Sequence, residues 1–427
     1  MLKPIITSLQ TEAAFQEITA AISAGMPPSN LRLPRAARLP ILAALHQNLQ
    51  VPILYLTHRS DHAITLADEL RLWLPEETLL LFPEPNPLFY ENSPWGSNTR
   101  RDRLIALTTL AAQLIPGARQ NTASAPIIIC PARAAMTRTL PRREFIKAVQ
   151  TIKLAQIAPP DQLIRHWVSL GYEPTTTVTE PGQFARRGGI LDIWVSADNA
   201  PTRIEFFGDE IDTLRYFDPT SQRTTQHHDH LRITPAREYL QPPTVESQAA
   251  LSEFHIPLLY SHPGRIFDYL PRNALVLVDD QYAFEENVQS VEEQAISLRN
   301  SYLEEGVLPE DFPIPYLTFD QIEDSLPQGR TLFMGPSTVS DDELPPLASQ
   351  FIPNQRFGGR IKPLMEKLAQ AAIDGEVSYI VSRQTARLID LWEEDYHPSA
   401  ATQHTPQFTK GTLTEGWLFQ SASGTKM

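Results

Sequence analysis

Short apolar runs alternate with helix-like segments in the first third of the chain. Runs typical of buried strands lie at residues 52–58, 78–82 and 125–130. Segments with apolar residues at helical spacing lie around them, at 10–24, 38–49, 61–74 and 100–114. Strands that alternate with helices predict an α/β domain with a largely parallel sheet, which we expect over residues 1–138.

The pattern then changes to closely spaced strands. The runs "FARRGGILDIWV" (184–195), "TRIEFF" (202–207) and "TLRYFD" (213–218) follow one another, and Gly208-Asp209-Glu210 between the last two suits a hairpin turn. We therefore expect a small β-rich (α+β) domain over residues 139–242, inserted into the α/β unit.

Another buried-strand run, "ALVLVDD" (274–280), predicts that the chain returns to the first sheet in a segment over 243–327. Residues 285–343 contain 14 acidic residues and only two basic ones, with "LPEDFPIP" in the middle. This composition indicates a surface segment and an acidic linker. The remaining residues, 328–427, repeat the order helix, turn, strand and helix, so we expect a third, small α/β domain there.

Composition narrows the possible functions. The 427-residue chain has 50 acidic and 36 basic residues and a formal charge of −14, which disfavours broad binding to a phosphate backbone. Its one cysteine, Cys130, excludes an intramolecular disulfide and predicts a buried, inert thiol. The N-terminus has no signal-peptide pattern, and no apolar stretch is long enough to span a bilayer. We expect a cytoplasmic protein without a membrane partner.

A phosphate-binding loop is missing from the sequence. The junction where one would lie reads "GMPPSNLRLPRAAR", whose prolines lack backbone donors, and no Gly-Lys-Ser/Thr occurs anywhere. The C-terminal "SGTKM" has the residue types in the wrong order. Asp279 and Asp280 end a strand, as the magnesium-binding acids of nucleotide-hydrolysing enzymes do. Without a phosphate-binding loop, the better interpretation is that they are turn residues. We therefore expect no nucleotide hydrolysis and no cofactor.

Two further clusters have structural explanations that we prefer. "QHHDH" (226–230) gathers three histidines, but neighbouring side chains on an extended chain point to opposite faces, so a solvated loop is favoured over a metal site. Phe89, Tyr90 and Trp95 precede three arginines and could stack on bases. The prolines and acids around them favour a rigid surface loop instead.

Arg186 and Arg187 stand between glycines at the start of an apolar strand, "PGQFARRGGILDIW" (181–194). The glycines allow a bulge or twist that projects both guanidinium groups. Guanidinium groups beside exposed aromatic surface, such as Phe184, are typical of protein interfaces. Charges that protect an edge strand from aggregation are an equally good explanation.

The stretches "GYEPTTTVTEPGQFARRGGILDIW", "RIEFFGDEIDTLRYFDPTSQRT" and "ITPAREYL", taken in order, resemble the UvrB-homology region of bacterial transcription-repair coupling factors. Later segments, including "FDYLPRNALVLVDD" and "FGGRIKPLMEKL", are similar to the parts that follow in that family. The resemblance covers nearly the whole chain. It implies a degenerate P-loop-NTPase-like parallel-sheet domain, an inserted β-rich domain and a small α/β domain.

In that family the inserted domain binds UvrA, the damage-recognition subunit of nucleotide excision repair. The resemblance assigns this role to Arg187, with Phe184 and Arg186 as weaker neighbours. Two residue changes depart from the family pattern: Glu173-Pro174 stands where another arginine is frequent, and Gln183 replaces a usual glutamate. They leave open whether UvrA binding is retained.

Family members continue into an RNA-polymerase-interacting domain and an ATP-hydrolysing translocase that acts on double-stranded DNA. We expect both to be missing from this chain, so that RNA polymerase and DNA are partners only through the missing domains. The sequence thus predicts a non-catalytic adaptor, not an enzyme, that binds UvrA and recruits repair to stalled polymerase. The alternative is a UvrB-like repair enzyme that binds DNA or uses ATP.

Overall fold

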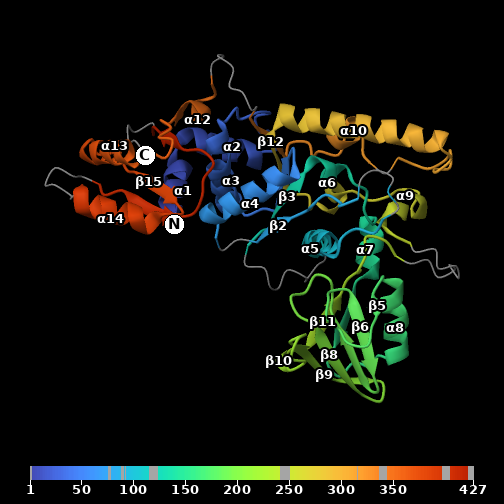
Figure 1. The fold of residues 1–427 in the computed structure, drawn as a ribbon. Helices are drawn as coiled ribbons and strands as arrows, with labels where there is room; N and C mark the ends of the chain where they lie inside the picture. Colours follow the sequence, from blue (N-terminus) through green and yellow to red (C-terminus); the bar gives the residue numbers. More distant parts are fainter. Residues whose placement is uncertain are drawn as a thin grey trace.

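The computed structural model describes residues 2–75, 78–87, 91, 93–114, 124–240, 251–314, 316–335, 344–396 and 404–421. Phe89, Tyr90 and the "SGTKM" segment, all named above, lie outside these ranges. Figure 1 shows an elongated upper part, formed by the first and last segments of the chain, and a β-rich domain that projects below it.

A five-stranded parallel sheet forms the centre of the upper part, in the order β13-β12-β1-β3-β2. Its strands are β1 (Ile53–Thr57), β2 (Leu79–Leu81), β3 (Ile127–Pro131), β12 (Leu275–Asp280) and β13 (Thr331–Gly335). Strands β1, β3 and β12 are buried throughout, as expected for apolar runs covered on both faces. The predicted return of "ALVLVDD" to the first sheet is confirmed, because β12 lies between β1 and β13.

Helices cover both faces of this sheet because successive side chains of each strand point to opposite sides. Ile53 and Tyr55 face one apolar core, and Leu54 and Leu56 face the other. The first core is covered by α1 (Lys3–Thr11), α2 (Ala13–Ser23), α3 (Arg35–Leu49) and α4 (Ser60–Trp73). The second is covered by α5 (Ser97–Leu114), α6 (Ala132–Met136), α7 (Arg142–Ala148), α10 (Gln281–Glu304) and α11 (Phe319–Glu323). The α/β fold class is thus confirmed.

The acidic stretch departs from the expected linker. Its first part is the 24-residue helix α10, which buries Phe284, Val288, Val291 and Ala295 against the sheet. These positions recur at helical spacing, so the charged residues occupy only the solvent side of a packed helix. The sheet also continues beyond residue 327, where we expected the small domain to begin, because β13 pairs with β12.

The β-rich domain has a six-stranded sheet in the order β10-β9-β8-β7-β6-β5. Its strands are β5 (Glu173–Pro174), β6 (Gln183–Arg187), β7 (Ile190–Ile193), β8 (Thr202–Phe207), β9 (Glu210–Phe217) and β10 (Thr224–His227). Helix α8 (Pro160–Ser169) packs on one face through Leu163 and Trp167. The chain enters through β4 (Gln150–Lys153) and leaves through β11 (His230–Ile233), which pair with each other, so the two ends of the insertion lie side by side.

Two hairpins of this sheet have tight turns that contain glycine. Gly208 and Asp209 form a two-residue turn, since Phe207 pairs with Glu210, and the predicted hairpin is confirmed. Gly188 and Gly189 form a second two-residue turn rather than a bulge, since Arg187 pairs with Ile190. Each turn opens with a glycine at positive φ, 61° for Gly188 and 63° for Gly208, a conformation that side chains rarely adopt.

The last part of the chain attaches to the first core and then forms a smaller body. Strands β14 (Phe351–Pro353) and β17 (Trp417–Phe419) pair antiparallel, and Phe351 and Phe419 are buried in the first core. Strands β15 (Tyr379–Ser382) and β16 (Gln407–Lys410) pair in parallel beside α13 (Ile361–Ile373) and α14 (Thr385–Asp395). The remaining short helices are α9 (Ile256–Leu259) and α12 (Pro346–Ser349). Within the described ranges, no helix combines the length and apolar character needed to cross a membrane.

Candidate functional site

The two arginines of β6 lie on opposite faces of the six-stranded sheet. Arg186 aligns with Leu191 and Ile204, on the face that α8 covers. Its Nη1 donates to Asp161 Oδ1 of α8 at 2.5 Å. Arg187 aligns with Ile190 and Glu205 on the opposite face, which we call the open face.

Arg187 is exposed and has only neutral acceptors among the residues that the structure describes. Its Nη2 donates to the carbonyl of Thr176 at 3.1 Å and to Thr177 Oγ1 at 2.8 Å. Glu205, in the same cross-strand row, instead forms an ion pair with Arg215 and accepts from Thr213 Oγ1 at 3.0 Å. The open face therefore presents a guanidinium group whose charge no described carboxylate neutralises.

A largely buried ion pair joins strands β7 and β8 on this same face. Asp192 of β7 accepts two hydrogen bonds from Arg203 of β8, at 2.8 Å and 2.9 Å. The Arg203 guanidinium also lies 4.6 Å from the ring centre of Phe217, and the hydrogen bonds to Asp192 raise its pKa. Asp192 and Arg203 thus find their partners within the sheet and stabilise the arrangement of its strands. Binding to another protein would fall to the exposed side chains of the face.

Phe184 does not contribute to an exposed aromatic surface, contrary to our expectation. Its side chain is only 4% exposed and lies edge-on to Trp167 of α8, with ring centres 5.7 Å apart. Trp194 is half-buried and donates its indole N–H to the carbonyl of Asp198 at 3.0 Å. The reason is the two-residue repeat of a strand, which places Phe184 on the face of Arg186 and not on that of Arg187.

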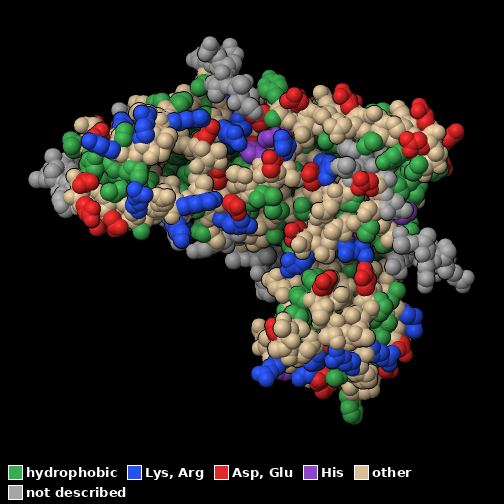
Figure 2. Space-filling model, viewed as in Figure 1, with side chains coloured by type: hydrophobic (Ala, Val, Ile, Leu, Met, Phe, Trp, Pro, Cys, Tyr) green, Lys and Arg blue, Asp and Glu red, His purple; other side chains and the backbone are tan. Residues whose placement is uncertain are grey.

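An exposed apolar group that the sequence reading missed lies on the open face. Phe207, the last residue of β8, is 83% exposed, and Ile157 is 76% exposed. Phe207 and Ile157 both pair with Glu210, one from each side, so the three residues form one row. The sequence signal for this exposed group is a phenylalanine directly before a Gly-Asp turn. Such a residue lies at the tip of a hairpin, where its own sheet cannot bury it. Figure 2 shows hydrophobic side chains protruding at the lower end of this domain beside Lys and Arg side chains.

The two residues that depart from the family pattern both have partners within the domain. Glu173 accepts from Arg237 Nη2 at 2.6 Å, and Arg237 also contacts the buried Glu253 at 3.5 Å. Gln183 Oε1 accepts from the backbone N–H groups of Thr179 and Glu180, at 3.0 Å and 3.1 Å. Gln183 alternates onto the same side of β6 as Arg187, and Glu173 pairs with Gln183, so both residues lie on the open-face side of the sheet with their polar groups already engaged.

The carboxyl end of the parallel sheet carries the two strand-terminal acids. Arg38, in the first turns of α3, lies 3.4 Å from Asp279 Oδ1 and 3.4 Å from Asp280 Oδ2, and all three side chains are only 3% exposed. Tyr55 donates its hydroxyl to Asp279 Oδ1 at 2.6 Å, and burial together with Asp279 raises the pKa of this tyrosine. An internal guanidinium thus pairs with both strand-terminal acids, which supports a structural role for the acid pair.

Two histidines lie beside the acids. His58 follows β1 directly, and His62 lies in the first turn of α4 with its ring centre 4.7 Å from that of His58. Burial lowers the pKa of both imidazoles, although Asp279 opposes the shift.

The "QHHDH" segment is not the loop that we expected, because its first two residues, Gln226 and His227, belong to β10. His228 stacks on Tyr216 with ring centres 4.2 Å apart, and His230 Nδ1 lies 2.7 Å from Asp229 Oδ1.

Of the described members of the aromatic and arginine cluster, Trp95 is 8% exposed and Arg103 is fully buried. These two side chains pack inside the molecule and are not available to stack on bases.

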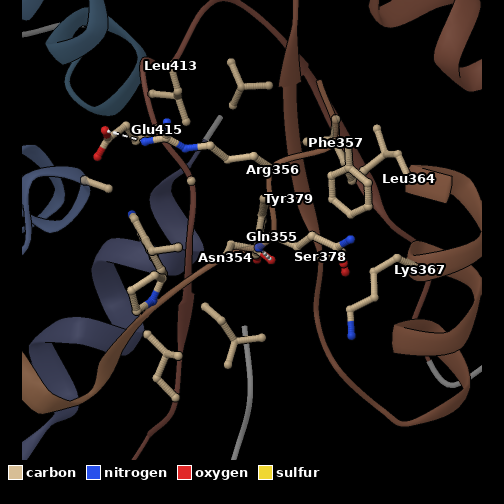
Figure 3. Close-up of a pocket in the computed structure, with 18 of the residues that line it drawn as sticks. Asn354, Gln355, Arg356, Phe357, Leu364, Lys367, Ser378, Tyr379, Leu413 and Glu415 are labelled. Atoms are coloured by element: carbon tan, nitrogen blue, oxygen red, sulfur yellow. Dashed lines mark hydrogen bonds and ion pairs between the residues drawn. The ribbon is translucent and has the colours of Figure 1, made fainter. Parts of the chain in front are cut away.

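A cavity of about 950 Å³ lies between the 351–359 segment, helix α13, strand β15 and the 413–418 segment. Figure 3 shows Arg356 reaching across it toward Glu415, and the two side chains form an ion pair with Nη2 and Oε1 3.2 Å apart. Phe357, Lys367 and Tyr379 come from other sides of the cavity. None of the candidate site residues predicted from the sequence lines this cavity, and its ionic contact is internal, so it defines no chemistry by itself.

Residues 151–239 match the sequence profile of the family described as the UvrB interaction domain. The six-stranded sheet with its open face therefore lies in a segment similar to domains of the UvrB interaction class. The resemblance of the chain to transcription-repair-coupling factors is confirmed as well: it is 26% identical over 355 residues to the one from Bacillus subtilis, covering 73% of this chain and 29% of the relative.

The relative from Myxococcus xanthus is 30% identical over 246 residues, covering 55% of this chain and 20% of the relative. The UvrABC system protein B of a Cyanothece strain is 26% identical over 241 residues, covering 56% of this chain and 34% of that protein. The chain thus spans a fifth to about a third of these curated relatives.

Proposed function

We propose that this chain is a non-catalytic adaptor of transcription-coupled nucleotide excision repair, whose inserted domain docks UvrA through its open face. The UvrB interaction class of residues 151–239 supports the partner, and the similarity to transcription-repair-coupling factors supports the pathway. RNA polymerase and double-stranded DNA would be partners through other domains of such a factor.

The observation that carries the proposal is the uncompensated charge of Arg187. An exposed guanidinium held by neutral acceptors in a rigid hairpin is arranged to receive a carboxylate of a partner, since little side-chain order remains to be lost on binding. The exposed ring of Phe207 in the same face would supply the apolar part of the contact. Arg186 and Phe184 support the face from behind, through α8.

The non-catalytic part of the proposal is supported by Arg38. A guanidinium buried between Asp279 and Asp280 forms ion pairs with both acids, and α3 begins after Pro34 without the glycine-rich turn that would hold the phosphates of a nucleotide. An ATPase rate above background for the purified chain, abolished by Asp279→Asn, would contradict this and favour the UvrB-like enzyme.

The adjacent arginines provide a matched test of docking. Biolayer interferometry with immobilised UvrA would compare the chain with Arg187→Ala and Arg186→Ala. We expect Arg187→Ala to weaken binding by ~30-fold or more, as for a residue central to an interface, and Arg186→Ala to change it less than about threefold. No binding by the unmodified chain, or equal losses in the two variants, would refute docking through the open face.

A further inference from the structure

Three metal-ligand side chains meet at the carboxyl end of the parallel sheet. His58, His62 and Asp279 come from the end of β1, the start of α4 and the end of β12, and one ligand atom from each lies within 4.8 Å of the other two. The two elements that carry the histidines are consecutive, and the register of β1 with β12 brings Asp279 beside them. Histidine side chains reach the surface of the upper part of the molecule between Lys and Arg side chains (Figure 2).

The buried carboxylate has one oxygen satisfied and one free of hydrogen bonds. Asp279 Oδ1 accepts from Tyr55 and contacts Arg38, whereas Oδ2 has no hydrogen-bond partner among the described residues. Oδ2 lies 3.5 Å from His62 Nδ1. His58 Nδ1 is likewise buried without a hydrogen-bond partner in the described part of the chain. Buried polar atoms normally find a partner, so an unpaired carboxylate oxygen and an unpaired imidazole nitrogen within one cluster of ligand groups indicate room for a ligand.

The charge balance permits a cation in spite of the nearby arginine. Asp279 and Asp280 carry two negative charges and Arg38 one positive charge, which leaves one net negative charge in a buried site. Arg35, which is exposed, approaches His62 Nε2 at 3.1 Å. Since a guanidinium only donates, this nitrogen accepts, and the ring proton lies on Nδ1, where it points to Thr57 Oγ1 at 2.7 Å.

We propose that His58, His62 and Asp279 bind a divalent transition-metal ion, of which Zn²⁺ is the natural probe. Two imidazoles and one carboxylate with open positions are a common ligand set for such ions. Ligand atoms in a tetrahedral zinc site lie about 3.3 Å apart, given bonds of about 2.0–2.1 Å, so binding requires a modest contraction. His58 is half-buried at the edge of the site. Coordination through His62 Nδ1 displaces the proton from that nitrogen. Once the ring proton lies on Nε2, this nitrogen no longer accepts the hydrogen bond from Arg35.

The test uses the complete chain after treatment with a chelator. Titration with Co²⁺, followed by its visible absorption, reports histidine and carboxylate ligation, and calorimetric titration with Zn²⁺ gives stoichiometry and affinity. We expect one ion per chain. His58→Ala and His62→Ala should each weaken binding by ~100-fold or more, since even supporting residues around metal ligands contribute 10–100-fold. Asp279 is left intact because it also holds Tyr55 and Arg38.

Two matched variants distinguish this site from adventitious binding. His230→Ala removes an exposed histidine elsewhere and should leave the affinity unchanged. Arg35→Gln removes the cation that competes for His62 and should tighten binding by about fivefold, the effect expected of one exposed charge at this range. Binding weaker than about 100 µM by the unmodified chain, equal binding by the His58→Ala/His62→Ala double variant, or weaker binding by Arg35→Gln would overturn the proposal.

Discussion

Arg103 of α5 and Glu238 at the exit of the β-rich domain form a bidentate ion pair that is completely buried. Nε and Nη2 of Arg103 donate to the two carboxylate oxygens at 2.5 Å and 3.0 Å, and the side chains are 0% and 1% exposed. The guanidinium also lies 3.9 Å from the ring centre of Phe82 and 4.7 Å from that of Trp95. This contact joins the inserted domain to the α/β domain.

Removing one partner of this pair should destabilise the attachment strongly. We expect Glu238→Gln to lower the free energy of unfolding by about 3–5 kcal/mol, because Arg103 would keep a buried, uncompensated charge. Urea unfolding followed by circular dichroism measures the change. The exposed pair Lys147 and Glu144 is the control, and Lys147→Ala should cost less than about 1 kcal/mol. Similar small losses in both variants would show that the buried pair does not carry the attachment.

The sequence predicted the sheet and its helices because each depends on a short-range pattern. Buried strands such as β1 are continuous apolar runs, and the alternation along β6 places Arg187 and Arg186 on opposite faces. The same alternation, applied to Phe184, would have placed it beside Arg186. The first part of the acidic stretch forms a packed helix instead of a linker, because the apolar stripe of α10 and not its net charge determines how it packs.

The contacts that could not be predicted join residues far apart in the chain. Arg103 and Glu238 are separated by 135 residues, and Arg38 and Asp279 by 241. No local sequence pattern predicts these pairs, because an arginine in a helix can equally well be exposed to solvent. The meeting of His58, His62 and Asp279 likewise depends on which strands become neighbours, which follows from the assembled sheet alone.

Phe184 should matter for stability rather than for direct recognition. Phe184→Ala leaves a cavity against Trp167 and should destabilise the β-rich domain by about 3–5 kcal/mol. Thermal unfolding followed by tryptophan fluorescence provides the measurement. A variant with unchanged stability and reduced UvrA binding would instead make Phe184 part of the interface.

Phe207 should show the opposite behaviour. Because its side chain is 83% exposed, Phe207→Ser should change the free energy of unfolding by less than about 0.5 kcal/mol. We expect it to weaken UvrA binding by ~10-fold or more if the open face is the docking surface. The exposed Leu258, outside the β-rich domain, is the matched control. Equal effects of Phe207→Ser and Leu258→Ser on binding would argue against a specific apolar contact.

Asp198 should make the stability of the β-rich domain depend on pH. Burial raises the pKa of its carboxyl to about 6, although Arg232 opposes the shift. The folded state therefore binds the proton more tightly than the unfolded state, whose pKa is about 3.9. The resulting stabilisation is complete below pH ~4 and is lost as the pH rises through about 6.

Asp198→Asn removes this titration while retaining the backbone carbonyl that accepts from Trp194. The variant should gain about 1–3 kcal/mol relative to the unmodified chain between pH 4 and pH 7.5. Urea midpoints across this range test the difference, with Asp209→Asn, at an exposed turn, as the control. Parallel stability profiles for Asp198→Asn and the unmodified chain would refute the shift.

Cys130 should be unreactive until the α/β domain unfolds. The thiol is fully buried in β3, and burial raises its pKa, so almost no thiolate forms near neutral pH. Because it is the single cysteine of the chain, labelling with a chromogenic disulfide reagent at pH 8 reports on this site alone. We expect no labelling over an hour in buffer and one equivalent within minutes in 6 M guanidinium. The thiol becomes accessible when the sheet opens. If attachment of the inserted domain stabilises that sheet, Glu238→Gln should accelerate labelling. Rapid labelling of the native chain would contradict the buried position of β3.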